Sequence, residues 1–340
     1  MHRSHKIENE NGTSAMRRKP IKMGIQHLNK FMRANCPDAI KPITLGQLRG
    51  KVIAVDTSIY MYRFAGEGIL IEGMYQLISL FRHYDIVPVF IFDGKMPTEK
   101  SDIMVIRRDA KVAAENKYNL VKERMKSSSE QDVIRELRYD LDSLRKKFIR
   151  LRNADIRNVK KLMDMCGVNY YEAEGEADQL CAKLVIKRKA YACLSEDMDL
   201  FVYGCPRVLR YLNLTNSRVV LYSLKYILEN LDMNLRQFKE VCIISGTDYN
   251  SLESKDCSLH KTLKHFAKYK KNKSTEEFYV WLERNTTYIA DYCKLCSTFF
   301  MFDTCDLNIS KLTKQRMTNT PVNKKMLHDF LHNYDFLFLD

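Results

Sequence analysis

The chain has 340 residues, of which 45% are hydrophobic, enough for one large core or two smaller ones. The 56 Lys and Arg residues exceed the 42 Asp and Glu residues, and the resulting formal charge of +14 suits a polyanionic partner such as nucleic acid. No run of about 18 apolar residues and no apolar signal-peptide segment is present, so we expect a soluble, intracellular protein with no membrane partner.

Residues 1–22 are polar and charged without periodicity, which predicts a disordered N-terminal extension. Beyond them, three apolar runs each end in an acid, at residues 51–56, 86–93 and 190–197. The runs are rich in apolar residues, do not alternate with polar ones and are separated by helical stretches. This pattern predicts an α/β fold with a central, mostly parallel sheet flanked by helices.

Between Lys100 and Arg152 the sequence is helical and highly charged, with fifteen Lys or Arg residues against nine Asp or Glu residues. Composition leaves two interpretations open: a solvated helical hairpin, or a basic arch that handles nucleic acid. After Asp248 the chain is again mostly helical and basic.

The ten cysteines follow no regular spacing and are interpreted as reduced thiols. Cys293 and Cys296 form a lone CxxC, and because a zinc site needs a second ligand pair, core or surface thiols are the favoured interpretation.

Asp56, Asp93 and Asp197 stand at the ends of the three apolar runs. Ligands of open parallel sheets bind outside the carboxyl ends of the strands, so these side chains are expected to meet in one cleft if the strands are neighbours. Carboxylates held a few Å apart stay ionised only beside positive charge, and Mg²⁺ favours carboxylate, water and phosphate oxygens.

Two further acidic sites extend this group. Residues 172–178 form an acid-rich turn between a short strand and a helix, and Asp248 follows a break at Gly246. Glu172 and Glu174 are also typical of helix capping, and any one of these sites taken singly is more often structural than catalytic.

Five motifs carry a family resemblance: Val55-Asp56-Thr-Ser, Val89-Phe-Ile-Phe-Asp93-Gly-Lys, Glu176-Ala-Asp178, Ser195-Glu-Asp-Met-Asp199 and Gly246-Thr-Asp248-Tyr. Between Met23 and about Tyr249 the chain resembles the structure-specific 5′-nucleases of the flap endonuclease family, which have a PIN-like nuclease fold. The resemblance implies two Mg²⁺ ions, replaceable by Mn²⁺, and two-metal hydrolysis of DNA phosphodiesters. It implies as metal ligands Asp56, Asp93, Glu176, Asp178, Asp197, Asp199 and Asp248, with Glu196 and Glu174 outside the set.

The resemblance also assigns residues that assist the reaction. Lys100 and Arg107, at the base of the arch, would reach the scissile phosphate as catalytic cations. Tyr62 would stack on a base near the cut, and Gly24 would lie near the active site in contact with DNA. From composition alone, a solvated helix face or core packing is the better interpretation of the first three.

The chain departs from the family in three places. Twenty-two residues precede Met23, and a translation start at Met23 is the favoured interpretation. The glycine-rich segment that the resemblance implies after Asp248, which grips duplex DNA and often binds K⁺, is replaced, so duplex contact would fall to Lys261, Lys264 and His265 and a K⁺ site is not expected. The C-terminus lacks a sliding-clamp peptide, since residues 331–339 are apolar enough to be core. A divergent member, for which a viral source is one interpretation, fits these differences.

The predicted organisation is an N-terminal nuclease region, a helical arch, an internal nuclease region and a helical C-terminal DNA-binding region. Their ranges are 23–105, 106–152, 153–250 and 251–340. The leading hypothesis is a monomeric Mg²⁺-dependent 5′ flap endonuclease of DNA replication and repair, located in the nucleus or at another site of DNA replication. The alternatives are a 5′-to-3′ exonuclease or junction resolvase of the same superfamily, and an inactive DNA-binding relative; a phosphatase lacks a matching motif.

Overall fold

The computed structural model describes residues 25–127, 131–250, 257–289, 291–305, 307–310, 312, 317–334 and 336. The predicted N-terminal extension and Gly24 lie outside these ranges. None of the helices described is both long enough and apolar enough to cross a bilayer.

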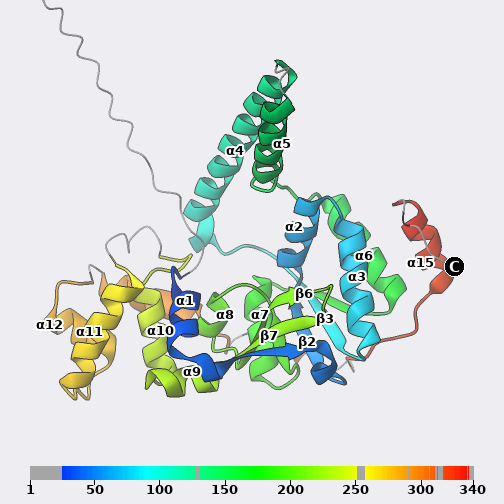
Figure 1. The fold of residues 1–340 in the computed structure, drawn as a ribbon. Helices are drawn as coiled ribbons and strands as arrows, with labels where there is room; N and C mark the ends of the chain where they lie inside the picture. The colour runs from blue at the N-terminus through cyan, green and yellow to red at the C-terminus, as the bar shows by residue number, and fades with distance from the viewer. Residues whose placement is uncertain are drawn as a thin grey trace, which may run out of the picture.

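A seven-stranded sheet forms the centre of the molecule (Figure 1), in the order β1-β7-β6-β5-β2-β3-β4. Its strands are β1 (Ile40–Thr44), β2 (Val52–Asp56), β3 (Val87–Phe92), β4 (Asn169–Glu172), β5 (Ala192–Leu194), β6 (Arg207–Asn213) and β7 (Arg218–Ser223). Strands β2 to β6 are parallel, whereas β1 and β7 pair antiparallel at one edge. The predicted mostly parallel sheet is confirmed.

Helices cover both faces of the sheet. The described part of the chain contains the helices α1 (Leu28–Asn35), α2 (Thr57–Glu67), α3 (Leu70–His83), α4 (Ser101–Ser127), α5 (Gln131–Arg145), α6 (Asn153–Cys166), α7 (Ala177–Ile186), α8 (Asp199–Val202), α9 (Leu224–Leu231), α10 (Leu235–Ile244), α11 (Leu259–Lys271), α12 (Phe278–Asn285), α13 (Tyr292–Met301) and α15 (Lys324–His332), and only some of them lie on the sheet. Single 3₁₀ turns are η1 (Pro37–Ala39), η2 (Leu45–Leu48) and η3 (Thr98–Lys100).

The central strands are buried on both faces, which explains their continuous apolar sequence. In β2, Ala54 belongs to the core cluster under α7 and α10, whereas Ile53 and Val55 belong to the cluster under α2, α3 and α6. Side chains of a strand point alternately to opposite faces, so every residue of such a strand must be apolar.

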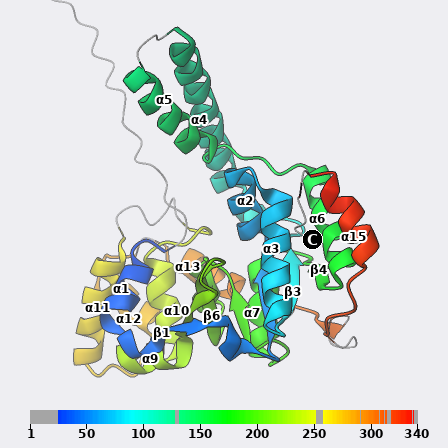
Figure 2. The ribbon, with the colours of Figure 1, turned by 45° about the vertical axis from the view of Figure 1, so that its right-hand side comes forward.

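The charged segment after residue 100 forms a helical hairpin. Helices α4 and α5 pack on each other and project away from the sheet (Figures 1 and 2). Leu137, Leu141 and Leu144 of α5 are buried at helical spacing, while Leu120 and Tyr139 remain exposed. We call α4 and α5 the arch; α4 begins at Ser101, five residues before the predicted boundary.

The C-terminal part of the chain divides in two. Helices α10 to α13 pack together beside the sheet, whereas α15 lies against α6 at the opposite end of the molecule (Figure 2). Backbone hydrogen bonds from Thr320 N to Gly167 O (2.8 Å) and from Asn323 N to Met165 O (2.9 Å) attach the segment before α15 to the end of α6, so that the C-terminus returns to this helix. Leu331 is fully buried, in agreement with a core segment. The range 251–340 therefore packs as two separate pieces.

Six of the ten cysteines are buried, and all ten are free. Those predicted in apolar settings, Cys166, Cys181, Cys193 and Cys242, are among the buried ones.

Candidate functional site

The predicted acids gather at one edge of the sheet because four neighbouring strands, β5, β2, β3 and β4, end there. Asp56 is the last residue of β2, and Asp93 directly follows β3. Glu176 is the N-cap of α7 after β4, and Asp178 lies in the first turn of that helix. Asp197 and Asp199 follow β5.

Local hydrogen bonds hold several of these carboxylates in place. Ser195 Oγ donates to Asp56 Oδ2 (2.9 Å), and the backbone N–H groups of Ala177 and Asp199 donate to Asp93 Oδ1 (2.9 Å) and Asp197 Oδ1 (2.9 Å). The strand ends and the turns that follow them are therefore cross-linked by the acids.

Close approach of backbone segments supports the same arrangement. Gly94 N donates to Gly175 O (2.8 Å), and a Cβ at Gly94 would lie 1.9 Å from Ala173 O. Only glycine fits there without displacing the backbone, which explains the glycine directly after Asp93.

The site is electrostatically demanding. Asp56, Asp178 and Asp199 are 6%, 8% and 2% exposed. Burial, with help from Asp93 and Asp197, raises the pKa of Asp56 to about 7. Burial first and neighbouring carboxylates second raise the pKa of Asp178 and of Asp199 well above the ordinary value. Such a cluster favours positive charge among its oxygens.

Two cations from the base of the arch enter this cluster. Lys100 Nζ, at the end of η3, lies 2.7 Å from both Glu176 carboxylate oxygens, and Arg107 Nη2 of α4 lies 2.5 Å from Asp248 Oδ2. Lys100 is 5% exposed. Burial alone would lower its pKa, but Tyr249, Glu176 and Asp178 outweigh that effect and raise it. Both predicted catalytic cations thus reach the acids.

The donor set is chemically suited to a hard divalent ion. It consists of carboxylate oxygens, and Asp199 Oδ1 is buried without a hydrogen-bond partner among the described residues, as a ligand oxygen would be. In the described ranges, however, no three His, Cys, Asp or Glu side chains are arranged so that they could hold a metal ion. Glu176 and Asp248 are instead paired with Lys100 and Arg107. The seven-residue ligand set remains a prediction.

Tyr249, next to Asp248, is a site residue that the sequence reasoning did not single out. Its hydroxyl donates to Glu176 Oε2 (2.6 Å), and Lys100 Nζ lies 4.3 Å from the centre of its ring. The signal for it was its place within the Gly246-Thr-Asp-Tyr motif.

Arg210 was also missed, although a basic residue within an apolar strand is a signal for a buried partner. It is 5% exposed and donates from Nη2 to Glu196 O (2.7 Å) and from Nη1 to Asn29 Oδ1 (3.0 Å). Glu196 Oε1 accepts from the N–H of Tyr211 (2.6 Å), a residue at φ +56°. Glu196 thus binds the loop of Asp197 to β6, and its exclusion from the ligand set remains a prediction.

Outside the cluster, Tyr62 of α2 is 41% exposed, and Lys111 Nζ of the arch lies 5.1 Å from its ring centre. Tyr62 also lines a pocket of about 360 Å³ between α2 and the segment that follows α5. Lys261 and Lys264 are exposed and lie one turn apart on α11. Gly24 and residues 251–256, which are half of the segment that replaces the expected glycine-rich one, lie outside the described ranges.

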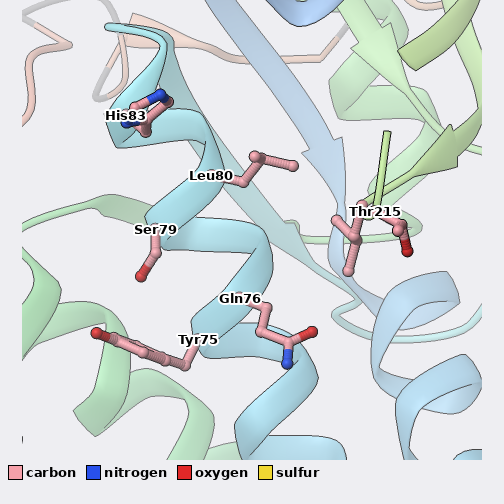
Figure 3. A pocket seen from close by; sticks show the side chains of 7 residues that line it. Tyr75, Gln76, Ser79, Leu80, His83 and Thr215 are labelled. Carbon is pink, nitrogen blue, oxygen red and sulfur yellow. The ribbon is translucent and has the colours of Figure 1, made fainter. Parts of the chain in front are cut away.

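A larger pocket of about 420 Å³ lies elsewhere, between α3 and the β6–β7 turn (Figure 3). Tyr75, Gln76, Ser79 and His83 of α3 and Thr215 of the β6–β7 turn line it. None of the acids contributes to it.

Comparison with known proteins agrees with this geometry. The XPG N-terminal domain model matches residues 23–114 and the XPG I-region model matches residues 167–248, so together they cover about half of the chain and all seven predicted ligand positions. Flap endonuclease 1 of Leishmania major is 29% identical over 249 residues, which are 67% of this chain and 60% of that protein. The chain belongs to the flap endonuclease family.

Solved structures of other nucleases share the fold of this chain. The catalytic core of Rad2 in complex with DNA substrate is 20% identical, with a TM-score of 0.59, and the alignment covers 91% of this chain and 94% of that one. Human GEN1 in complex with Holliday junction DNA is 17% identical, with a TM-score of 0.57 and coverage of 92% and 74%. The chain spans about 60% of the length of the first curated flap endonucleases that it matches.

Proposed function

We propose that this protein is a Mg²⁺-dependent, structure-specific 5′ flap endonuclease that hydrolyses DNA phosphodiesters in replication and repair. One observation carries the proposal: acids from four adjacent strand ends meet two cations from the base of a projecting helical hairpin. Paired acids for metal and cations for phosphate are the groups that phosphodiester hydrolysis needs.

In the proposed mechanism the carboxylates hold two ions, for which Mn²⁺ can substitute. The ligands are Asp56, Asp93, Glu176, Asp178, Asp197, Asp199 and Asp248. When bound, the ions activate the attacking water and stabilise the leaving oxygen. The raised pKa of the buried Asp56 and Asp199 supports this role, because positive charge is what keeps such acids ionised at neutral pH.

Lys100 and Arg107 act on the substrate phosphate in this proposal. Both already approach the acidic cluster, and both come from the segment where η3 passes into α4. A guanidinium and an ammonium placed there neutralise charge that develops on the phosphate. Tyr62, exposed beside Lys111, offers its ring to a base near the cut.

The remaining parts of the chain would hold the DNA, which is the proposed partner. Residues 23–105 and 153–250 form the nuclease regions, and the arch receives the 5′ single strand. Lys261, Lys264 and Gly24 contact the DNA in this proposal. A monomer suffices for this assignment, and neither a clamp peptide nor a K⁺ site is part of it.

The test is cleavage of a 5′-labelled double-flap DNA, a nicked duplex and a four-way junction, each with Mg²⁺ and with EDTA. Asp197→Ala is the inactive variant, and Glu229→Ala, which removes an exposed acid on α9, is the matched control. We expect Mg²⁺-dependent cutting at the base of the flap that is lost in the first variant and kept in the second.

The other products separate the alternatives. A ladder from the duplex 5′ end identifies an exonuclease, and paired cuts in the four-way junction identify a resolvase. Binding of DNA that survives EDTA, with no product from any substrate in Mg²⁺ or Mn²⁺, identifies an inactive relative.

A further inference from the structure

The side chain of Tyr249 lies between the base of the arch and the acid-bearing turn after β4. It is 6% exposed and makes two different contacts. Its hydroxyl donates to Glu176 Oε2 at 2.6 Å, and its ring centre lies 4.3 Å from the Lys100 ammonium nitrogen. One side chain therefore contacts both a predicted metal ligand and a predicted catalytic cation.

We propose that Tyr249 is a positioning residue that orients the Glu176 carboxylate through its hydroxyl and retains the Lys100 ammonium through its ring. The inference rests on the proposed function, since it assigns to Tyr249 a role in the same site.

The two contacts solve a conflict within the site. Lys100 Nζ lies 2.7 Å from both oxygens of Glu176, so the ammonium is paired with the same carboxylate oxygens that a divalent ion would bind. A cation near Glu176 repels the ammonium, and the buried Lys100 then requires another partner. The face of the Tyr249 ring attracts an ammonium but offers no carboxylate oxygen to a metal ion. The ring can therefore keep Lys100 at the site after Glu176 is engaged.

The surroundings fix the position of Tyr249 itself. Its hydroxyl lies 3.0 Å from Tyr203 Oη and accepts from Gln179 Nε2 at 3.3 Å, and its ring packs edge-on against Phe302 with centres 5.2 Å apart. Gln179 of α7, Tyr203 directly after α8 and Phe302 directly after α13 thus keep the Tyr249 hydroxyl directed at Glu176. Outer partners of metal ligands act in this way on ligand orientation.

Two variants separate the two contacts. Tyr249→Phe removes the hydroxyl and keeps the ring, whereas Tyr249→Leu removes both. The control is Tyr279→Phe, which deletes a buried hydroxyl that has no hydrogen-bond partner among the residues described. Circular dichroism and thermal melting verify that each variant is folded.

The first readout does not depend on cleavage. Binding of Mn²⁺ to the protein without DNA is measured by electron paramagnetic resonance. We expect the Mn²⁺ dissociation constant to rise about tenfold in Tyr249→Phe, in line with the loss of an outer partner of a ligand, and to stay within about twofold in the control.

The second readout is single-turnover cleavage of the double-flap DNA at saturating Mn²⁺. Tyr249→Phe should keep its rate within about threefold, because the ring remains, whereas Tyr249→Leu should lose about thirtyfold, as expected for a desolvated cation–π contact. In a Lys100→Met background the Leu substitution should cause no further loss, since the cation on which the ring acts is gone.

Unchanged Mn²⁺ affinity in a folded Tyr249→Phe protein would overturn the role of the hydroxyl. Equal losses from Tyr249→Leu with and without Lys100 would overturn the role of the ring. If the wild-type protein cleaves none of the DNA substrates, the proposed function fails, but the Mn²⁺ measurement still decides the contact between Tyr249 and Glu176. If Tyr249→Leu does not fold, Tyr249→Phe still tests the hydroxyl.

Discussion

Glu240 of α10 is a buried acid outside the predicted ligand set, and it should make stability fall as the pH rises. Its side chain is 1% exposed and lies 3.4 Å from Arg236 Nε. The guanidinium of Arg236, which is 54% exposed, also pairs with Glu277. Burial raises the pKa of Glu240 to about 7, because Arg236 compensates only part of the cost of burying the charge.

The sign follows from which state holds the proton. Between the ordinary Glu pKa of about 4.5 and the folded value of about 7, the folded protein keeps a proton that the unfolded chain has lost. The stability contributed by the protonated acid is therefore fully present below the unfolded pKa and is lost as the pH rises through the folded one. At about 1.4 kcal/mol per pKa unit, the loss between pH 5 and pH 8 is about 2.5 kcal/mol.

The assay is urea denaturation of the wild-type protein and of Glu240→Gln at pH 5 and pH 8. Other buried acids also titrate in this range, so the quantity of interest is the difference between the two proteins. We expect the wild-type protein to lose about 2.5 kcal/mol more than Glu240→Gln between the two pH values. Glu229→Gln, an exposed acid on the neighbouring helix α9, serves as the control and should follow the wild-type protein. Parallel pH dependence in wild type and Glu240→Gln, within about 0.5 kcal/mol, would refute the reasoning.

Three further changes test packing, two of them next to the site and one at the C-terminal helix α15. Gly94→Ala places a Cβ 1.9 Å from Ala173 O and should lower the free energy of unfolding in urea by about 1–3 kcal/mol or more. Arg210→Met leaves the carbonyl of Glu196 without its buried donor and should cost about 2–4 kcal/mol in the same assay; an unchanged midpoint would contradict the contact. Leu331→Ala opens a cavity between α15 and α6 and should cost about 2–5 kcal/mol, measured by thermal melting, if the C-terminal return is part of the core.

The fold was predictable where burial leaves a direct mark on the sequence. The runs around residues 52–56 and 87–92 are apolar at every position because both faces of these strands are covered. Asp56 and Asp93 stand out against such runs, since a charge directly after a buried strand needs a partner. The chain order of strands and helices, and the acids as one set, could therefore be inferred before the structure.

Contacts between distant segments left no such mark. Lys100 and Glu176 are 76 residues apart, and their pairing exists because β3 and β4 are neighbours in the sheet while the arch lies between them in sequence. Arg210 donates a hydrogen bond to Asn29, which is 181 residues away in the sequence. The residues around Lys100 and around Arg210 in the sequence do not predict which distant residue each will contact. Local propensity and periodicity describe only one helix or strand at a time.

The type of fold and the group of acids could be inferred from local residue patterns, because the periodicity of burial and the chemistry of each residue are local properties, whereas Lys100 and Arg107 were assigned through the family resemblance. Tertiary structure decided the strand order β5-β2-β3-β4, and with it the approach of Lys100 and Arg107 to Glu176 and Asp248 and the place of Tyr249 between them. It also decided that α15 returns to α6. The physical reason is that these contacts depend on which packing of the whole chain buries the most apolar surface while satisfying the buried polar groups.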